Sequence, residues 1–453
     1  MSKSVVKKYS MDMCEGPILK KMLFFTLPLM ASSLLQLLFN AADIIVVGQF
    51  AGDNSLAAVG STTSLVNLFV NFFIGLSVGV NVLAARFYGA KREKDLSETV
   101  HTAMAISVVS GIVLTIVGTL GAPQILSWMQ TPKEVLDLAV VYLRTYFMGM
   151  TAMMIYNFGA AILRAVGDTR RPLYYLMVAG VINVIFNLFF VIVFHWGVFG
   201  VGLATTISQI ISAVLIVRCL IKEQGAIQVR LREIKIHKNL LLKILQIGVP
   251  AGFQSILFSL SNVFIQSSVN SFGATVMAGN SAASNIEGFV YVSMNSFHQA
   301  AIAFTSQNYG AKKYDRINRI LFTAQGCTIV VGTVLGLGMV ALGPILLRLY
   351  TTSSDVVTAG MVRLSIICAT YALCGVMDVM VGALRGIGYS VVPMIISLIG
   401  ACATRLIWLS TVFQIEAFHK IEIVYIIYPI SWILTAIAHI ITFTIARRKI
   451  EQR

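Results

Sequence analysis

Residues 21–47 read KMLFFTLPLMASSLLQLLFNAADIIVV, an apolar run that carries the large polar side chains Gln36, Asn40 and Asp43 in its second half. About 20 apolar residues are enough for a helix to cross roughly 30 Å of hydrocarbon, so this run predicts a membrane-spanning helix. The 453-residue chain around it is 57% hydrophobic and only 12% charged. Soluble domains carry about twice that share of charge, so we expect lipid to be the main solvent of this protein.

The same length criterion finds eleven further apolar runs. The predicted spans are 21–47, 56–84, 101–127, 138–163, 172–194, 199–221, 243–270, 278–307, 319–345, 358–384, 393–415 and 424–447. The expected fold class is therefore an all-α integral membrane protein with twelve transmembrane helices. The segment before the first span is polar and lacks the features of a cleavable signal. The six cysteines show no CxxC spacing, so we expect neither a structural metal nor a disulfide framework.

Twelve spans would place both termini on the same side of the membrane. The loops of that side hold 28 of the 34 Lys and Arg residues, and the loops of the opposite side hold 3. Because basic loops stay in the cytoplasm, we expect cytoplasmic termini and a multi-pass protein of the cell (plasma or inner) membrane. The net charge of +15 then reflects orientation in the membrane, and no nucleic-acid partner is expected.

Three pairs of matching segments indicate an internal duplication. Pro28 and Asn40 correspond to Pro250 and Asn262, Tyr88-Gly89-Ala90-Lys91 to Tyr309-Gly310-Ala311-Lys312, and Leu163-Arg164 to Leu384-Arg385, at offsets of 221 to 222 residues. We predict a cytoplasmic segment at 1–20, six-helix bundles at 21–221 and 243–447, a basic cytoplasmic linker at 222–242 and a tail at 448–453. Two copies with an even number of spans should be related by a pseudo-two-fold axis along the membrane normal, as in transporters built from parallel repeats. Such bundles suit alternating access, whereas a channel would need a filter loop.

Only three acids, Asp43, Glu287 and Asp378, fall well inside the predicted spans. Ionisable groups in hydrocarbon are costly and therefore suggest function. Gln36, Asn40 and Asp43 share one face of the first span. The polar residues that we expect to meet them are Asn157, Asn183, Asn187 and Thr205. Such oxygen ligands suit a hard cation such as Na⁺, with Asp43, Asn183, Asn187 and Thr205 as its ligands; alternatively, Asp43 carries a proton. Interhelical hydrogen bonding alone is the structural alternative.

The second half of the chain offers a different set of polar residues. Asn262 and Gln266 follow one face of the seventh span, Glu287 and Tyr291 lie on the eighth, and Asp378 lies on the tenth. Glu287 and Asp378 are candidates for attracting a cationic substrate or for a second coupling site. The alternative for Asp378 is an ion pair with Arg385 or with Arg405.

Several motifs now make a family resemblance specific. They are Leu27-Pro28, Leu35-Gln36-Leu37-Leu38-Phe39-Asn40-Ala41-Ala42-Asp43, Val47-Gly48, Leu56-Ala57-Ala58-Val59-Gly60, Ala161-Ile162-Leu163-Arg164-Ala165-Val166-Gly167-Asp168-Thr169 and Gly382-Ala383-Leu384-Arg385-Gly386. With these motifs the chain resembles the multidrug and toxic compound extrusion (MATE) family, and within it the DinF-like branch that includes MepA-like exporters. The motifs span both halves, and the expected twelve spans fit.

The resemblance implies an antiporter that exports small organic, cationic drugs or toxic compounds in exchange for H⁺ or Na⁺. It implies that an acid at the position of Asp43 carries the coupling ion, and Asn183 and Thr205 match other polar positions of that site. Many relatives have a second acid where this chain has Asn187, a departure that favours loading of a single proton. The rival within the same superfamily is a flippase of lipids or lipid-linked precursors. We find no HExxH motif, and we expect no enzyme activity, no cofactor and a monomer.

Overall fold

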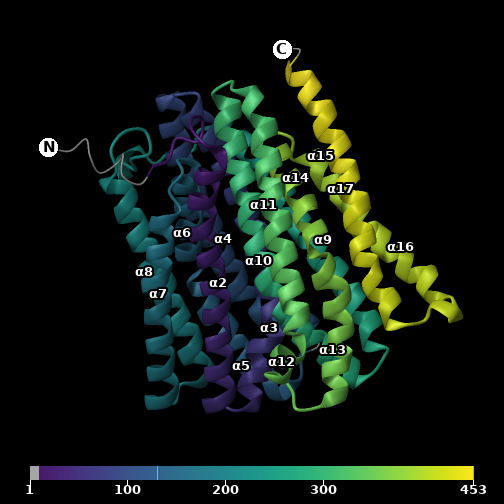
Figure 1. Cartoon of the computed structure of the whole chain (residues 1–453). Helices are drawn as coiled ribbons and strands as arrows, with labels where there is room; N and C mark the ends of the chain where they lie inside the picture. The colour runs from purple at the N-terminus through teal and green to yellow at the C-terminus, as the bar shows by residue number, and fades with distance from the viewer. Residues whose placement is uncertain (1–9, 130, 452–453) are drawn as a thin grey trace. The chain divides into compact units, whose positions relative to one another are not determined.

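The computed structural model describes residues 10–129 and 131–451, and within them it contains helices and no β-strand. The chain forms two compact units (Figure 1). Unit 1 holds the described residues up to Asp12 together with Ala31–Gly252, and unit 2 holds Met13–Met30 and the residues from Phe253 onward. The predicted linker at 222–242 therefore belongs to unit 1.

The helices of the first half of the chain are long and follow one another with short connections. They are α2 (Ile18–Phe50), α3 (Asp53–Gly89), α4 (Glu93–Trp128), α5 (Lys133–Met148), α6 (Met150–Ala165), α7 (Arg170–Leu188), the π-helical segment η1 (Phe189–Val193), α8 (Gly197–Lys222) and the short turn η2 (Leu231–Glu233).

The second half repeats this pattern with more interruptions. Its elements are α9 (Lys238–Asn270), α10 (Ala274–Gly310), α11 (Tyr314–Ala341), α12 (Gly343–Arg348), α13 (Ser354–Ile367), η3 (Cys368–Thr370), α14 (Tyr371–Gly386), α15 (Val391–Ser397), the π-helical η4 (Leu398–Ala403), α16 (Thr404–Ser410), η5 (Val412–Gln414), η6 (Glu416–Phe418) and α17 (Ile421–Glu451).

The helices account for the twelve predicted spans. By length and composition, 10 helices of the described chain can cross a membrane, and the bent pair α5 and α6 adds an eleventh. The twelfth is α10, which has 37 residues but carries Asn280, Glu287 and many hydroxyl side chains. Hydropathy alone does not mark α10 as a span because its polar side chains are numerous, and many of them are buried inside unit 2.

The fourth predicted span is broken, which the apolar pattern did not indicate. α5 and α6 meet at Gly149 with a bend of 44°. A Cβ atom on Gly149 would lie 2.1 Å from Oε1 of Gln209 on α8, so the backbone approaches α8 closely here. The Thr206 hydroxyl of α8 donates to the Thr145 carbonyl at 2.7 Å. Such a partner is needed where a break frees a carbonyl group inside the membrane.

The backbone itself repeats at the offset of the sequence motifs. Positive φ angles occur at Gly52 and Gly273 (85° and 93°), at Lys91 and Lys312 (55° and 56°), and at Gly167 and Gly388 (90° and 102°). Each pair is 221 residues apart. Lysine rarely adopts this conformation, so its occurrence in both Tyr-Gly-Ala-Lys turns is strong structural support for the duplication.

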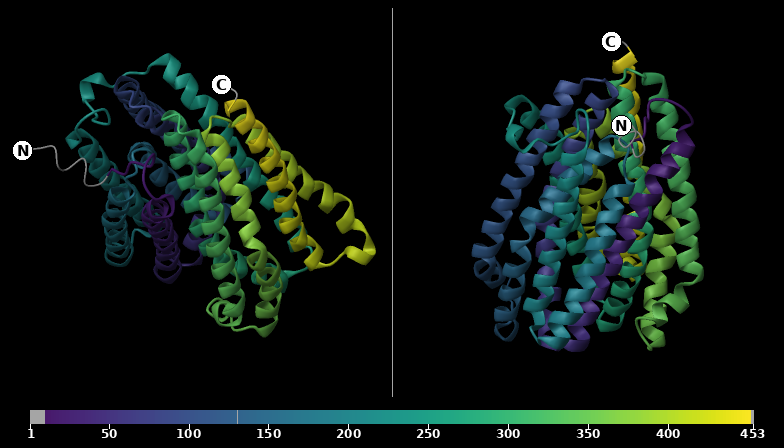
Figure 2. Two further views of the ribbon diagram at one scale, coloured as in Figure 1. Left: turned by 45° about the horizontal axis from the view of Figure 1, so that its top comes forward. Right: turned by 90° about the vertical axis from the view of Figure 1, so that its left-hand side faces the viewer.

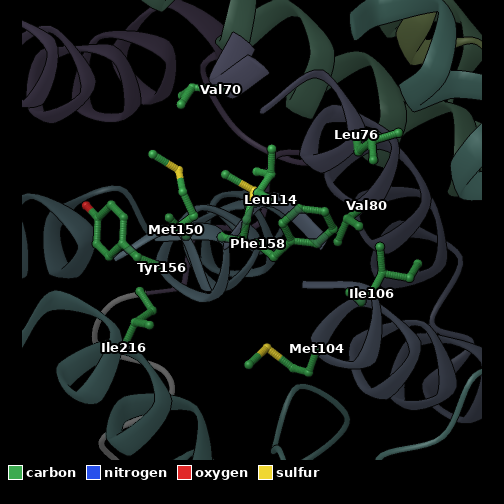
Figure 3. Packing of buried hydrophobic residues seen from close by; sticks show 14 of the residues in the cluster. Val70, Leu76, Val80, Met104, Ile106, Leu114, Met150, Tyr156, Phe158 and Ile216 are labelled. Atoms are coloured by element: carbon green, nitrogen blue, oxygen red, sulfur yellow. The ribbon is translucent and has the colours of Figure 1, made fainter. Parts of the chain in front are cut away.

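The core of unit 1 lies between α3, α4, α6 and α8 (Figure 3). Leu114, Met150 and Phe158 are almost completely buried at its centre. The Phe147 ring covers Gly118, where an added Cβ would lie 1.8 Å from a ring carbon. Small residues let helices pack closely in membranes, where no hydrophobic effect drives helices together. This core holds α7 and α8, which pack against each other, in place.

Two helices contribute to both units. α2 belongs to unit 2 up to Met30 and to unit 1 from Ala31, and α9 belongs to unit 1 up to Gly252 and to unit 2 from Phe253. Each contains one proline two residues before its change of unit, Pro28 in α2 and Pro250 in α9. Because proline removes a backbone hydrogen bond, each helix is weakened next to the point where it leaves one unit for the other.

Candidate cation-coupling site

Four of the polar residues predicted for the first half come together inside unit 1. Asp43 lies in the second half of α2, Asn183 and Asn187 lie one turn apart on α7, and Thr205 lies on α8. Asn183 and Asn187 are buried, while Asp43 and Thr205 are partly buried. α7 passes into the π-helical segment η1 directly after this turn, and π-helical turns often accompany functional sites.

The two amides of α7 direct their donors at Asp43. Nδ2 of Asn187 donates to Oδ1 of Asp43 at 2.6 Å. With its amide nitrogen toward Asp43, Asn183 donates to the same oxygen at 2.9 Å, and its own oxygen accepts from the Thr205 backbone N–H at 3.3 Å. The opposite orientation of Asn183 would set its amide oxygen against the carboxylate. Oδ1 of Asn187 is buried and has no hydrogen-bond partner in the described structure.

The carboxylate of Asp43 has no basic partner in the part of the chain that the structure describes, where no Lys, Arg or His nitrogen forms an ion pair with it. Amide and hydroxyl dipoles stabilise a carboxylate without neutralising its charge. Because a net charge in hydrocarbon is costly, a proton on Asp43 or a metal ion beside it would lower the cost of burying this carboxylate.

Among the described residues, the other predicted members of this site form no hydrogen bond with the four. Gln36 and Asn40 are exposed in the described chain. Nδ2 of Asn157 donates at 2.9 Å to the Met153 carbonyl of its own helix, α6.

Two tyrosines near Asp43 were missed in the sequence. Tyr142 and Tyr146 lie one turn apart on α5, with ring centroids separated by 5.9 Å, and both are close enough to interact electrostatically with Asp43. Their i, i+4 spacing indicates that they share one face of α5. The sequence alone does not show which helix that face contacts, so the two tyrosines could not be assigned to the site.

Glu287 in unit 2 is neutralised by a base. Its carboxylate accepts from Nε of Arg363 on α13 at 3.2 Å and from a second guanidinium nitrogen. A third nitrogen of Arg363 donates to Oδ1 of Asn280 at 2.6 Å, and the Tyr425 hydroxyl donates to the same oxygen at 3.1 Å. Gln266 accepts from Asn280 at 2.8 Å. The predicted residues Glu287 and Gln266 thus belong to one buried network, whose base, Arg363, had not been assigned a role from the sequence.

Asp378 is not part of that network. In the described structure no ion pair joins it to Arg385 or to Arg405. Arg385 donates to Gln254 at 2.7 Å, and Arg405 lies over the Tyr428 ring at 4.3 Å. Asp378 interacts electrostatically with Arg385, without forming an ion pair, and with Tyr291, whose ring is 6.5 Å from that of Tyr371.

Asn262, the remaining predicted residue of the second half, is exposed. The polar residues of unit 2 therefore do not form a single site.

The duplication agrees with what the family model finds. The model of the MatE family matches residues 28–189 and 250–408, one segment in each copy. The chain belongs to the MatE family. MatE proteins are transporters, so this chain is a multi-pass membrane transporter and not an enzyme.

Relatives of this MatE chain cover nearly its full length. “Probable multidrug resistance protein YoeA” of Bacillus subtilis is 29% identical over 423 residues, which are 91% of this chain and 90% of the relative. “Multidrug export protein MepA” of Staphylococcus aureus is 20% identical over 83% of each chain. A solved “outward-facing conformation of a multidrug resistance MATE family transporter” superposes with a TM-score of 0.92 at 20% identity and covers 100% of both chains. These comparisons confirm the all-α, twelve-helix MatE fold.

Proposed function

We propose that this MatE protein exports organic cations, including drugs, in exchange for protons that bind Asp43. The observation that carries the proposal is the unneutralised carboxyl group of Asp43, held by the amides of Asn183 and Asn187 inside the first bundle. The names of YoeA and MepA, which refer to multidrug resistance and export, support drugs as the cargo.

The arrangement of donors favours a proton over Na⁺. Asn183 and Asn187 both direct N–H groups at Asp43, whereas Na⁺ requires several oxygen ligands. A proton needs only the carboxyl group, and it removes the charge that hydrocarbon disfavours.

The orientation completes the proposal. Because the loops of one side carry 28 of the 34 Lys and Arg residues, we place both termini in the cytoplasm and the protein in the cell membrane. Protons that enter Asp43 from outside and leave it to the cytoplasm would then drive export of the cargo.

Transport in vesicles tests this proposal. The purified protein is reconstituted, and ethidium movement is followed under an imposed proton gradient or an imposed Na⁺ gradient. We expect the proton gradient to drive transport and Asp43→Asn to abolish it. The matched control is Asp137→Asn, the same change at an exposed position of α5, which should transport as the parent does. Full activity of Asp43→Asn would overturn the assignment of the site.

Asn187→Asp separates the two coupling ions. Its carboxylate would lie next to Asp43, since Nδ2 of Asn187 is 2.6 Å from Oδ1 of Asp43. Two adjacent carboxylates attract a cation strongly, so this variant should gain Na⁺-driven transport that the parent lacks. Na⁺-driven transport by the parent would contradict proton coupling.

The flippase alternative is disfavoured by the use of the buried bases in unit 2. Arg363 is paired with Glu287, and Arg405 contacts Tyr428 and donates to Ser431 at 3.1 Å. Both guanidinium groups therefore already have partners within the protein, which leaves them less suited to holding a lipid phosphate.

A further inference from the structure

The loop between α8 and α9 is held firmly against α4. The Val229 N–H donates to the Leu220 carbonyl at 3.0 Å, and the Arg230 N–H donates to Nε2 of His101 at 3.1 Å. The His237 N–H donates to the Thr102 hydroxyl at 3.2 Å. Figure 2 shows this teal loop beside the helices of unit 1. These bonds fix which side chains of the loop point inward.

The apolar side chains of this loop divide into two sets. Ile227 and Val229 are 6% and 1% exposed and join the core of unit 1. Leu231 and Ile236 are 63% and 40% exposed. Both lie outside the membrane-spanning helices, so lipid tails around the spans do not account for their exposure. The backbone bonds at Arg230 and His237 prevent these two side chains from turning toward the core.

Bases accompany the two exposed apolar residues. Arg230, Arg232, Lys235 and Lys238 are all exposed. The acids of the loop are engaged elsewhere: Glu223 pairs with Arg171, and Glu233 accepts from Arg230 at 3.0 Å. Arg232, Lys235 and Lys238 are therefore not matched by acids of the loop, and they surround Leu231 and Ile236.

The two ends of the loop set its distance from the membrane. α8 ends at Lys222 and α9 begins at Lys238. The predicted spans of these two helices end at residue 221 and begin at residue 243, so the loop lies within a few residues of the predicted bilayer boundary. Bases next to exposed apolar side chains are typical of segments that lie in the interface of an anionic membrane. A protein partner with acidic side chains would account for the bases of the loop. It would not explain why the loop is hydrogen-bonded to α4 next to the predicted membrane boundary.

We propose that residues 230–238 are a peripheral anchor that binds anionic phospholipids of the cytoplasmic leaflet. Leu231 and Ile236 enter the headgroup region, while Arg232, Lys235 and Lys238 contact lipid phosphates. The anchor holds the start of α9 and the cytoplasmic end of α4 at a fixed depth. This assignment depends on the orientation proposed above and is independent of the coupling ion.

A fluorescent probe at position 231 tests the anchor. Leu231→Cys is labelled with an environment-sensitive fluorophore in the full chain and placed in nanodiscs of phosphatidylcholine, with or without phosphatidylglycerol. A nitroxide-labelled lipid serves as quencher. Cys327 is the one cysteine of the described chain that is not buried, so the labelled parent provides the background signal. Lys94→Cys, at a side chain that is 89% exposed, is the matched control for a position in water.

We expect strong quenching at position 231 and little at position 94, with more quenching at 231 when phosphatidylglycerol is present. Arg232→Gln and Lys235→Gln should each shift the equilibrium between the inserted and the water-exposed loop about fivefold toward water, because a base near an anionic surface contributes about 1 kcal/mol. The shift is measured as weaker quenching at position 231 in discs that contain phosphatidylglycerol. A melting temperature equal to that of the parent shows that each labelled protein is folded.

Three results would overturn the anchor. A probe at position 231 that is not quenched in discs of either lipid composition would exclude insertion of Leu231. Quenching that is identical in the charge variants would exclude headgroup recognition. A signal at 231 that grows with the number of protein copies per disc would identify a second copy of the chain as the occupant.

Discussion

At the scale of single residues, two acids inside the membrane differ in how their charge is balanced. Glu287 shares two hydrogen bonds with the Arg363 guanidinium, whereas the described groups that donate to Asp43 are uncharged. An acid with its own base is neutral as a pair at every stage of a transport cycle. An acid without one changes charge when a cation arrives, so Asp43 is suited to coupling and Glu287 to holding α10 against α13.

The pairing of Glu287 predicts a large effect on stability. Glu287→Ala would leave Arg363 buried and uncompensated, which should lower the free energy of unfolding by about 3–5 kcal/mol. The double variant with methionine at both positions should recover most of this loss, because it removes both charges and fills a similar volume. Thermal unfolding in detergent measures the effect, and Glu416→Ala, at an exposed acid, is the control. Equal stability of Glu287→Ala and the parent would show that the pair is not formed.

The sequence indicates the acids but not their partners. Spacing along one helix places Asn183 and Asn187 on a common face. The cost of a charge in hydrocarbon makes Asp43 a candidate functional residue. The contact of Glu287 with Arg363 depends on the packing of α10 against α13, 76 residues apart in the chain. Helical periodicity relates residues a few positions apart and does not indicate contacts between residues so far apart in the chain. The network of unit 2 could therefore not be predicted.

At the scale of elements, α3 and the first part of α9 pack through small residues. A Cβ on Gly75 would lie 2.4 Å from the Gly252 backbone, and one on Gly79 would lie 2.3 Å from the Ile244 carbonyl. Gly75 and Gly79 lie one turn apart on α3, as Gly248 and Gly252 do on α9, the spacing that allows close helix contact in membranes.

Gly79→Leu should therefore separate α3 from α9. Overpacking of this kind costs typically about 1–3 kcal/mol, and here the obstacle is backbone, which cannot move aside. The control is Gly60→Leu on the same helix, because nothing lies within 4 Å of a Cβ at Gly60. The melting temperature in detergent is measured for both variants. It should fall for Gly79→Leu and stay at the parent value for Gly60→Leu. A similar melting temperature for the two variants would contradict this packing.

The elements themselves were predicted well where apolar length decides them. All twelve spans have helical counterparts, including α10, whose polar side chains turn inward. The breaks were not predicted: the bend at Gly149 and the π-helical segments η1 and η4 interrupt apolar runs that are continuous in the sequence. Apolar composition is the same on both sides of such a break, so a hydropathy pattern does not reveal it.

At the scale of the whole molecule, the distribution of bases predicts which loops face the cytoplasm. Lys94→Cys, at the start of α4, should react with a membrane-impermeant maleimide only after cells are permeabilised. Lys420→Cys, in the exposed connection before α17, should react in intact cells. The parent measures background labelling, since five of its six cysteines are buried. Labelling of Lys94→Cys in intact cells would reverse the proposed orientation.

The exchange of helix segments between the two units affects how the protein can be made. Residues 13–30 leave the ribosome early, but the rest of unit 2 is synthesised only after Gly252. Until then the start of α2 lacks its final neighbours, such as Phe304, whose ring contacts Phe25 at 5.7 Å. A chain cut in the α8–α9 loop would likewise leave its first fragment without residues 238–252. Biogenesis should therefore finish as one late assembly step, and the two fragments of a split gene should accumulate only when they are produced together.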